Sequence, residues 1–336
     1  MKTLPRVTLA SWPTPLEEAP RLAEALGLEK LYVKRDDLTG LGLGGNKVRK
    51  LEYLLGEAIA RGADTVITTA GAQSNFLRLT AVAARRLGLR PILVVRGTRP
   101  ASLQGNLLLM HLAGADLRFV DTADAYDAST IALMRDIGEQ VEAAGHHPYL
   151  IHLGTFSGGL AAVGYVTGGL ELVEQCRAAG ISQSRIAVAV GSGGTYAGLL
   201  LGLRIAGGAF HVQGASVLSP VPFLRARIRE KAHAAAEILG VSATLREEEI
   251  DVTDGLIGAG YGTPPDESLD AVYLAARTEG LILDPIYTGR ALAALRQAVR
   301  ARAIRDGETP VFIHTGGAPN VFAHAEALSA HAAVKP

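Results

Sequence analysis

The sequence predicts an α/β protein of two lobes, with parallel-rich twisted sheets flanked by helices. Three observations lead to this fold class. Apolar, β-branched runs alternate with segments of helical period, which is the pattern of βαβ units and parallel sheets. The chain has 336 residues, more than the roughly 250–300 at which a single core stops growing. Aromatic residues make up only 5% of the chain while glycine accounts for 39 residues, so we expect helices that pack closely on the sheets.

The predicted strands and helices follow from local composition. Runs such as TVITT at 65–69 and RIAVAV at 185–190 are rich in β-branched residues, which favour strands. Longer segments with apolar residues three and four apart favour helices. Doubly wound sheets bind ligands at the carboxyl ends of their strands, so we expect the chemistry there. The predicted strands are 30–34, 65–69, 91–95, 117–121, 148–152, 185–190, 211–217 and 310–314, and the predicted helices are 46–61, 75–87, 124–144, 160–179, 195–205, 222–239, 266–279 and 288–303.

Composition excludes several classes of protein. Lys plus Arg and Asp plus Glu number 33 each, so there is no basic excess with which to bind a nucleic acid. No apolar run reaches about 18 residues, so no membrane span is expected. Residues 1–20 lack the apolar core of a signal peptide, which favours a cytoplasmic protein. The single cysteine, Cys176, excludes an intramolecular disulfide, and the scattered histidines predict no metal site.

The first segment with a chemical signature runs from residue 34 to residue 52. A strand ends there, a glycine-rich loop follows, and Asn46 is expected to cap a helix that begins at Lys47. The chain has only 7 lysines, and the positive end of a helix dipole disfavours a charged amine. Lys47 is therefore a candidate for a covalent bond to a carbonyl group, and the alternative is a solvated lysine. Lys50, one turn later, is expected to tolerate replacement far better.

The second segment is a glycine-rich turn that follows a predicted strand and opens a helix. Backbone amides in such a turn bind phosphate. A dinucleotide fingerprint would require glycine where Tyr196 stands, and no acidic residue ends the next strand. The turn therefore predicts a site for a single phosphate group, and the alternative is a tight turn without a ligand. Its residues are Gly191, Ser192, Gly193, Gly194 and Thr195.

Three further segments place polar residues after predicted strands. Ser74 and Asn75 would start a helix whose N-terminus suits a carboxylate, or would only cap that helix. Tyr287 and Thr288 lie together in a second segment, and Thr315 lies in a third. Each of these puts a hydroxyl group beside glycine near the end of a strand.

Taken in order, these segments resemble one enzyme family. The chain reads GGNKVRKLEYL at 44–54, AQSN at 72–75, GSGGTYAG at 191–198, LDPIYTGRA at 283–291 and FIHTGGAP at 312–319. These motifs are similar to those of pyridoxal-phosphate enzymes of fold type II, which are tryptophan synthase β-like, and within them to the D-cysteine desulfhydrase and 1-aminocyclopropane-1-carboxylate deaminase group. The resemblance runs from about residue 13 to residue 322. Each motif alone is weakly specific, but five in this order are strongly specific.

The resemblance implies a role for each candidate residue. Lys47 resembles the lysine that binds pyridoxal 5'-phosphate covalently, and residues 191–195 resemble its phosphate site. Asn75 resembles the residue that bonds the phenolic oxygen, and Thr288 the one that faces the pyridine nitrogen, with Thr315 beside it. Ser74 resembles the group that holds the substrate carboxylate. The implied catalytic residues are Lys47, Tyr287 and Ser74, and the implied substrate-binding residues are Ser74, Asn75, Phe76, Tyr261 and Tyr287.

Two positions favour elimination over ring opening. A deaminase that opens a cyclopropane ring is expected to have Glu in place of Thr288 and Leu in place of Thr315. A neutral hydroxyl makes a weaker electron sink, which suits β-elimination of a good leaving group. Phe76 and Phe156 depart from the family pattern, and they either narrow the space around the β-substituent or pack between the lobes. If they face the substrate, a sulfonate would lose its hydration without gaining a partner.

The sequence thus predicts a large cofactor-binding domain of residues 1–50 and 158–336, a small inserted domain of residues 51–157, and an active site between them. The predicted reaction is pyridoxal-phosphate-dependent elimination on a small amino acid by a homodimer, with D-cysteine giving pyruvate, ammonia and hydrogen sulfide. Alternatives are a 1-aminocyclopropane-1-carboxylate deaminase, a lyase for another substrate such as L-cysteate, and, from another class, a nicotinamide-dependent oxidoreductase.

Overall fold

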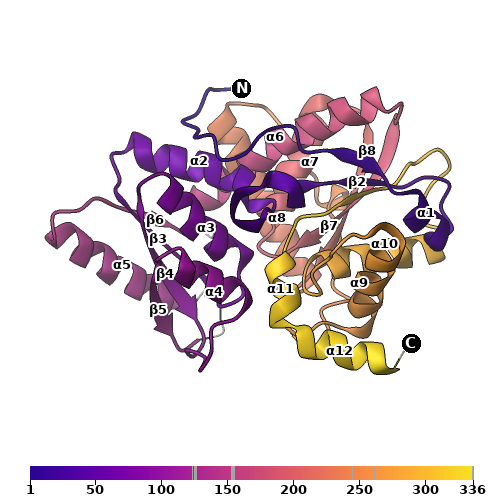
Figure 1. The fold of residues 1–336 in the computed structure, drawn as a ribbon. Helices are drawn as coiled ribbons and strands as arrows, with labels where there is room; N and C mark the ends of the chain where they lie inside the picture. The colour runs from indigo at the N-terminus through magenta and orange to yellow at the C-terminus, as the bar shows by residue number, and fades with distance from the viewer. Residues whose placement is uncertain (123, 125–126, 153–155, 244, 261, 335–336) are drawn as a thin grey trace.

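The computed structural model describes residues 1–122, 124, 127–152, 156–243, 245–260 and 262–334. Its strands form two separate sheets, one of six strands and one of four. Helices flank both sheets, and the four-stranded sheet lies to one side of the six-stranded sheet (Figure 1). This arrangement confirms the predicted α/β class, because parallel sheets need helices to cover their faces.

The six-stranded sheet has the order β1-β2-β10-β7-β8-β9. Every neighbouring pair is parallel except β1 and β2, which pair antiparallel at one edge. Strand β7 is buried along nearly its whole length, as an interior strand between two helix layers must be. The strands are β1 Leu16–Glu18, β2 Tyr32–Lys34, β7 Gln183–Val190, β8 Ala209–Ser216, β9 Asp251–Thr253 and β10 Val311–Ile313.

The four-stranded sheet has the order β5-β4-β3-β6, and all of its pairs are parallel. Its strands are β3 Thr65–Gly71, β4 Arg90–Arg96, β5 Asp116–Val120 and β6 Pro148–Ile151. All four come from one stretch of chain between β2 and β7 of the other sheet. The domain limits at residues 50/51 and 157/158 stay a prediction, although these strands fall inside the predicted insertion.

Each predicted helix has a counterpart in the structure, with shifted ends. Helix α6 begins at Phe156, four residues before the prediction, and α5 begins at Ala128, four residues after it. The helices are α1 Pro20–Leu26, α2 Lys47–Ala60, α3 Asn75–Arg86, α4 Gly105–Leu112, α5 Ala128–Ala143, α6 Phe156–Ala178, α7 Gly194–Ala206, α8 Val221–Leu239, α9 Asp266–Glu279, α10 Thr288–Arg300, α11 Ala318–Ala323 and α12 Ala325–Val334, with short 3-10 turns at Asp36–Thr39, Leu41–Leu43 and Glu247–Glu249.

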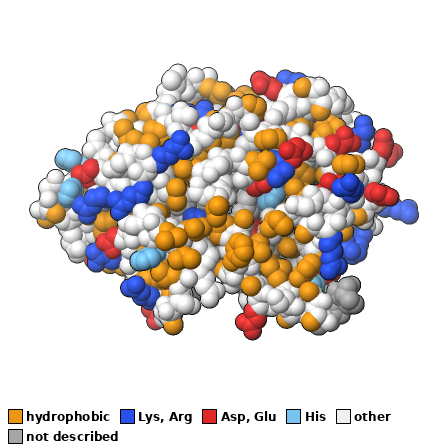
Figure 2. All heavy atoms as spheres, in the orientation of Figure 1, with side chains coloured by type: hydrophobic (Ala, Val, Ile, Leu, Met, Phe, Trp, Pro, Cys, Tyr) orange, Lys and Arg blue, Asp and Glu red, His pale blue; other side chains and the backbone are white. Residues whose placement is uncertain are grey.

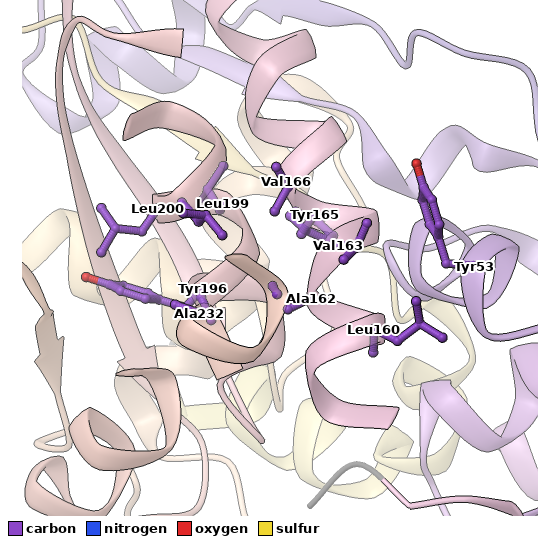
Figure 3. Packing of buried hydrophobic residues seen from close by; sticks show 14 of the residues in the cluster. Tyr53, Leu160, Ala162, Val163, Tyr165, Val166, Tyr196, Leu199, Leu200 and Ala232 are labelled. Atoms are coloured by element: carbon purple, nitrogen blue, oxygen red, sulfur yellow. The ribbon is translucent and has the colours of Figure 1, made fainter. Parts of the chain in front are cut away.

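Helices α6 and α7 lie with their backbones in contact. A Cβ atom on Gly198 of α7 would lie 2.1 Å from the carbonyl oxygen of Ala162, and one on Gly202 would lie 2.4 Å from that of Val166. Only glycine permits this approach. Apolar side chains of α2, α6, α7 and α8 form the main core around the contact (Figure 3). At these positions glycine brings two helices together, whereas the composition predicted close packing of helices on the sheets.

The surface carries charges of both signs. In Figure 2, Lys and Arg side chains alternate with Asp and Glu across the visible face, while hydrophobic side chains gather at its lower centre. Within the part of the chain that the structure describes, no helix combines the length and apolarity that a membrane span requires.

Candidate active site

Asn46 holds the glycine-rich loop against two other strand ends. Its N–H donates to the carbonyl oxygen of Thr315, which follows β10, at 3.0 Å. Its side-chain Nδ2 donates to Oγ1 of Thr195, which follows β7, at 3.1 Å. Asn46 occupies the N-cap position of α2, as predicted, but its side chain makes no capping hydrogen bond and bonds Thr195 and Lys47 instead. As a result, Lys47, Thr195 and Thr315 come together at the carboxyl ends of neighbouring parallel strands.

The turn that delivers Lys47 requires glycine. Gly44 has a φ of 68°, and a Cβ atom on it would lie 1.7 Å from the carbonyl oxygen of Asp37. Arg78 of α3 fixes the same turn by donating to the carbonyl oxygens of Gly42 and Gly44, the latter at 3.0 Å. The loop before Lys47 therefore packs against Asp37, which follows β2 of the six-stranded sheet. It is also hydrogen-bonded to Arg78, which follows β3 of the four-stranded sheet.

The amine of Lys47 is half-buried and donates from Nζ to Oδ1 of Asn46 at 3.0 Å. Burial lowers the pKa of Lys47 to about 8, although the charges of Asp284 and Asp36 act in the opposite direction. A lowered pKa raises the fraction of neutral amine near pH 7, and the neutral amine is the nucleophile. Burial thus makes the amine of Lys47 more nucleophilic, and its covalent bond to a carbonyl group stays a prediction.

Residues 191–195 form a cradle of backbone amides between β7 and α7. Gly193 has a φ of 85°, a left-handed conformation that glycine adopts at little cost, and α7 begins at Gly194. A Cβ atom on Gly191 would lie 3.6 Å from Cε1 of Tyr287, so the tyrosine ring lies beside the cradle. The start of this 13-residue helix directs N–H groups and the positive end of its dipole toward a bound anion.

Lys50 lies next to this cradle. Its side chain is 3% exposed, and its Nζ would be 3.4 Å from a Cβ atom on Gly194. Burial lowers the pKa of Lys50 well below its usual range, and the positive charges of Lys47 and Lys231 lower it further. The expectation that Lys50 tolerates replacement far better than Lys47 therefore loses its basis. The spacing in the sequence is the signal that could have found it, because residues three apart lie on the same face of a helix.

Ser74 and Asn75 stand at the start of α3. Oγ of Ser74 accepts hydrogen bonds from the N–H groups of Phe76 (3.2 Å) and Leu77 (3.3 Å), which is ordinary N-capping. Oδ1 of Asn75 accepts from Nδ2 of Asn106 at 2.9 Å. Phe76 is buried in the main hydrophobic core, which supports the packing interpretation of this ring. Contact of Phe76 with a substrate stays a prediction.

Asp284 organises the start of α10, and the sequence analysis missed it. Its carboxylate accepts from the N–H groups of Ile286 (3.1 Å), Tyr287 (2.9 Å) and Thr288 (2.9 Å), and from Oγ1 of Thr288 (2.8 Å). Oγ1 of Thr288 in turn accepts from the N–H of Asp284 at 2.7 Å. This fixes the Thr288 hydroxyl in one orientation. An acidic residue just before a predicted helix start is the signal that could have found it.

Most of the predicted residues thus lie around one region, at strand ends of both sheets. Lys47, Thr195 and Thr315 are linked through Asn46, and Tyr287 lies beside Gly191. Tyr261 lies outside the described residues, as does the side chain of Phe156. Their predicted places at the site stay predictions.

The residues present fit the cofactor that the resemblance implies. Pyridoxal phosphate needs an amine, a phosphate site and a partner for its ring nitrogen. Lys47 can supply the amine, the amides of residues 191–195 the phosphate site, and Thr288 the hydroxyl. The amine of Lys50 is buried beside the cradle with a lowered pKa, and a buried amine holds a positive charge only when that charge is paired. A phosphate on the cradle would supply the pairing charge.

Comparisons with known proteins agree with this fit. A family described as "Pyridoxal-phosphate dependent enzyme" matches residues 7–316. Over 328 residues, 98% of this chain and 96% of the relative, the chain is 39% identical to a Pyrococcus abyssi protein named provisionally as a 1-aminocyclopropane-1-carboxylate deaminase. It is also 39% identical to a D-cysteine desulfhydrase of Salmonella typhi, over 95% of this chain and 96% of that protein.

A solved structure shares the fold over almost the full chain. It is described as an ACC deaminase homologue, and it superposes with a TM-score of 0.89 at 37% sequence identity. The match covers 98% of this chain and 96% of the other. The two-lobed fold predicted from the motifs is therefore confirmed.

Proposed function

Because the chain belongs to the pyridoxal-phosphate-dependent enzymes, we propose that it eliminates the β-substituent of a small amino acid and that its substrate is D-cysteine. The family match and the named relatives identify the chain as a lyase that depends on pyridoxal phosphate. They exclude the nicotinamide-dependent oxidoreductase. Relatives named for D-cysteine and for 1-aminocyclopropane-1-carboxylate are equally similar to it. The choice between them depends on the residues of the site.

The observation that carries the choice is the neutral hydroxyl of Thr288. This side chain is fully buried, and its Oγ1 accepts from the N–H of Asp284 at 2.7 Å. Its own proton is donated to Oδ1 of Asp284 at 2.8 Å, and we propose that it turns to the ring nitrogen when the cofactor is bound. A nitrogen that accepts a hydrogen bond is left unprotonated, so its ring is a weaker electron sink than one protonated by a carboxylate. A weak sink suffices when the leaving group departs early, as a thiol does.

Lys47 and Ser74 have the two remaining roles, which are removal of the α-proton and binding of the substrate carboxylate. When bound, the cofactor stabilises the electron pair left on Cα after deprotonation. Lys47, once the substrate amine has displaced it, can take the α-proton, because its lowered pKa near 8 suits a general base. Oγ of Ser74 accepts from two amides of α3 and keeps its proton to donate to the substrate carboxylate.

The chemistry balances as follows. The Cα–H and Cβ–S bonds of D-cysteine break, and the electron pair of the first forms the Cα=Cβ bond. The sulfur leaves with the electron pair of the second and takes up a proton as hydrogen sulfide. The released 2-aminoacrylate adds water and loses ammonia to give pyruvate. One D-cysteine and one water thus yield pyruvate, ammonia and hydrogen sulfide.

A substrate panel tests the proposal. The purified holoenzyme is given D-cysteine, L-cysteine, β-chloro-D-alanine, L-cysteate and 1-aminocyclopropane-1-carboxylate, and the 2-oxo acids and sulfide are quantified. We expect equal amounts of pyruvate and sulfide from D-cysteine, and poor turnover of L-cysteate. Faster release of 2-oxobutyrate from the cyclopropane substrate than of pyruvate from D-cysteine would establish the deaminase instead.

We also propose that the enzyme works as a homodimer. Leu112 at the end of α4 is 70% exposed and Phe322 of α11 is 72% exposed, and these two helices contact each other. Large apolar side chains in such a position favour an interface, and most oligomers are symmetric dimers. Sedimentation of wild type and of a Leu112→Glu, Phe322→Glu double variant tests this, since the variant should be monomeric. The cytoplasmic location stays a prediction.

A further inference from the structure

Lys231 reaches the phosphate cradle from a helix that the sequence motifs do not include. It lies on α8, its side chain is 3% exposed, and its Nζ donates to the carbonyl oxygen of Ser192. Its Cδ would lie 3.9 Å from a Cβ atom on Gly194, the same glycine that Nζ of Lys50 approaches from the other helix. Two buried amines from α2 and α8 therefore converge on one turn.

The charges around this turn are unbalanced. Lys47, Lys50 and Lys231 are three of the chain's 7 lysines. The positive charges of Lys47 and Lys231 both lower the pKa of Lys50. Burial lowers the pKa of Lys231 to about 8, with the charge of Arg227 as a further cause. The carboxylate of Glu230 opposes this, but it is 55% exposed and pairs with Arg227 at 2.8 Å. Buried amines placed so close together carry their full positive charge only when an anion lies beside them.

We propose that Lys231 is a phosphate-binding residue, and that Lys231 and Lys50 together supply the two positive charges that neutralise the phosphate dianion of the cofactor on the amides of residues 191–195. The proposal rests on the placement of the cofactor described above. A phosphate monoester carries nearly two negative charges at pH 7. An ammonium has three donors, so Lys231 can bond the carbonyl oxygen of Ser192 and still donate to a phosphate oxygen.

The competing explanation is that Lys231 only ties α8 to the turn through Ser192. If Lys231 has only this structural role, replacing it should weaken the binding of every ligand of the cradle to the same extent. A counter-charge would matter only for ligands that carry the phosphate. Pyridoxal, which keeps the aldehyde and the ring but lacks the phosphate, separates the two roles.

The test compares binding of pyridoxal 5'-phosphate and pyridoxal to apoenzyme by absorbance titration and by thermal shift. The variants are Lys231→Met, which keeps the shape of the side chain, Lys231→Gln, which keeps a donor without charge, and Lys231→Arg, which keeps the charge. Arg229→Met is the matched control, because Arg229 is a cation on the same helix with a 58% exposed side chain.

We expect Lys231→Met and Lys231→Gln to weaken binding of pyridoxal 5'-phosphate by about 10- to 100-fold, the effect of losing a charge-assisted hydrogen bond. Pyridoxal binding should change less than about 2-fold. The stabilisation by pyridoxal 5'-phosphate in the thermal shift should shrink accordingly, while Lys231→Arg and Arg229→Met stay close to wild type. If Lys231→Met does not fold, Lys231→Gln decides.

Two results would overturn the proposal. Equal weakening for both ligands would make Lys231 a structural tie, and unchanged binding of both would remove it from the site. Failure of the cofactor placement has a different signature, since wild-type apoenzyme would then bind neither ligand at Lys47.

Discussion

Nδ2 of Asn106 on α4 lies 3.0 Å from Oδ1 of Asn320 on α11, and both side chains are buried. The bond joins the part of the chain that carries the four-stranded sheet to the part that carries the six-stranded sheet, where α4 and α11 lie side by side (Figure 1). Nδ2 of Asn106 also donates to Oδ1 of Asn75, and Nδ2 of Asn320 approaches Oδ2 of Asp284 at 3.4 Å. A continuous path of amides thus connects the start of α3 with the carboxylate that orients Thr288.

Replacing Asn320 with alanine should loosen this path. We expect Asn320→Ala to lower the free energy of unfolding by about 1–3 kcal/mol, because buried polar partners lose a hydrogen bond. Urea unfolding measures the loss. The exposed Gln297→Ala on α10 serves as control and should stay within about 0.5 kcal/mol of wild type. Equal stability of the two variants would show that the hydrogen bonds of this amide path do not contribute to the free energy of unfolding.

Replacing Lys47 with alanine should abolish the reaction and leave the fold intact. We expect turnover to fall by at least about 10²–10⁴-fold, as loss of a general base alone would cause, and the visible absorbance band of the lysine-bound cofactor to disappear. Circular dichroism checks the fold. Lys30→Ala is the appropriate control, because Lys30 is exposed whereas Lys50 is buried. Substantial turnover by Lys47→Ala would end the assignment.

Replacing Thr288 with glutamate should alter the choice of reaction. A carboxylate facing the ring nitrogen would keep it protonated and slow β-elimination of D-cysteine. With Thr315→Leu added, turnover of the cyclopropane substrate should become detectable. The new carboxylate would also lie beside that of Asp284, so we expect a stability loss of about 1–3 kcal/mol. Steady-state rates on both substrates measure the effect.

The control for this prediction is Thr288→Ser, which keeps the hydroxyl that Asp284 holds. It should retain the substrate preference of wild type. Elimination by Thr288→Glu at the wild-type rate would contradict the assigned role of Thr288.

Stability should fall at acid pH because of Asp36. Burial raises the pKa of this carboxyl, but the charge and hydrogen bonds of Arg49 outweigh burial and bring it to about 2, against an ordinary 3.8. A carboxyl group whose pKa is lower in the folded than in the unfolded protein stabilises the fold when the pH is above its unfolded pKa. This stabilisation is lost as the pH falls through the pKa of the folded state. We expect a loss of about 2 kcal/mol from this group between pH 4 and pH 2.

Thermal unfolding between about pH 2 and pH 5 measures this contribution. Asp36→Asn should be less stable than wild type near neutral pH, because Arg49 loses one of its two carboxylate partners and keeps only Glu171. Its acid slope should nevertheless be shallower than that of wild type. Parallel slopes would assign the acid sensitivity to other groups.

Adding a methyl group at the α6–α7 contact should destabilise the fold. A Cβ atom on Gly198 would meet both the carbonyl oxygen of Ala162 and Cβ of Tyr165, the latter at 2.7 Å. We expect Gly198→Ala to cost about 1–3 kcal/mol of unfolding free energy, as overpacking does. Gly255→Ala has only Oγ1 of Thr253 near its new methyl, at 3.7 Å, and should be nearly neutral in the same thermal unfolding experiment.

Elements whose signal is local could be predicted from the sequence. Strands β3, β4 and β7 are long apolar runs, and their pattern identifies them without tertiary information. Strands β1 and β9 have three residues each, LEE and DVT, which carry no strand pattern and form only because a neighbouring strand offers backbone partners. Helix α4 is absent from the predicted helices, because it begins with Gly105 and glycine disfavours a helix.

The same distinction holds in the site. Lys47 and the turn at 191–195 are recognisable because a strand end, glycine and a helix start follow one another in the chain. Asn106 and Lys231 are not, since their partners Asn75 and Ser192 lie 31 and 39 residues away. No rule of local spacing joins such positions. Only the folded chain brings them within hydrogen-bonding distance.

Asn46 shows how tightly a residue without chemistry of its own can be constrained. Its backbone N–H, its amide nitrogen and its amide oxygen each bond a different residue: Thr315, Thr195 and Lys47. Aspartate would keep the shape but lose the donor toward Thr195, and serine would be too short to reach both side chains. Position 46 therefore accepts few other side chains, because a replacement must offer both a donor and an acceptor at the reach of an asparagine amide.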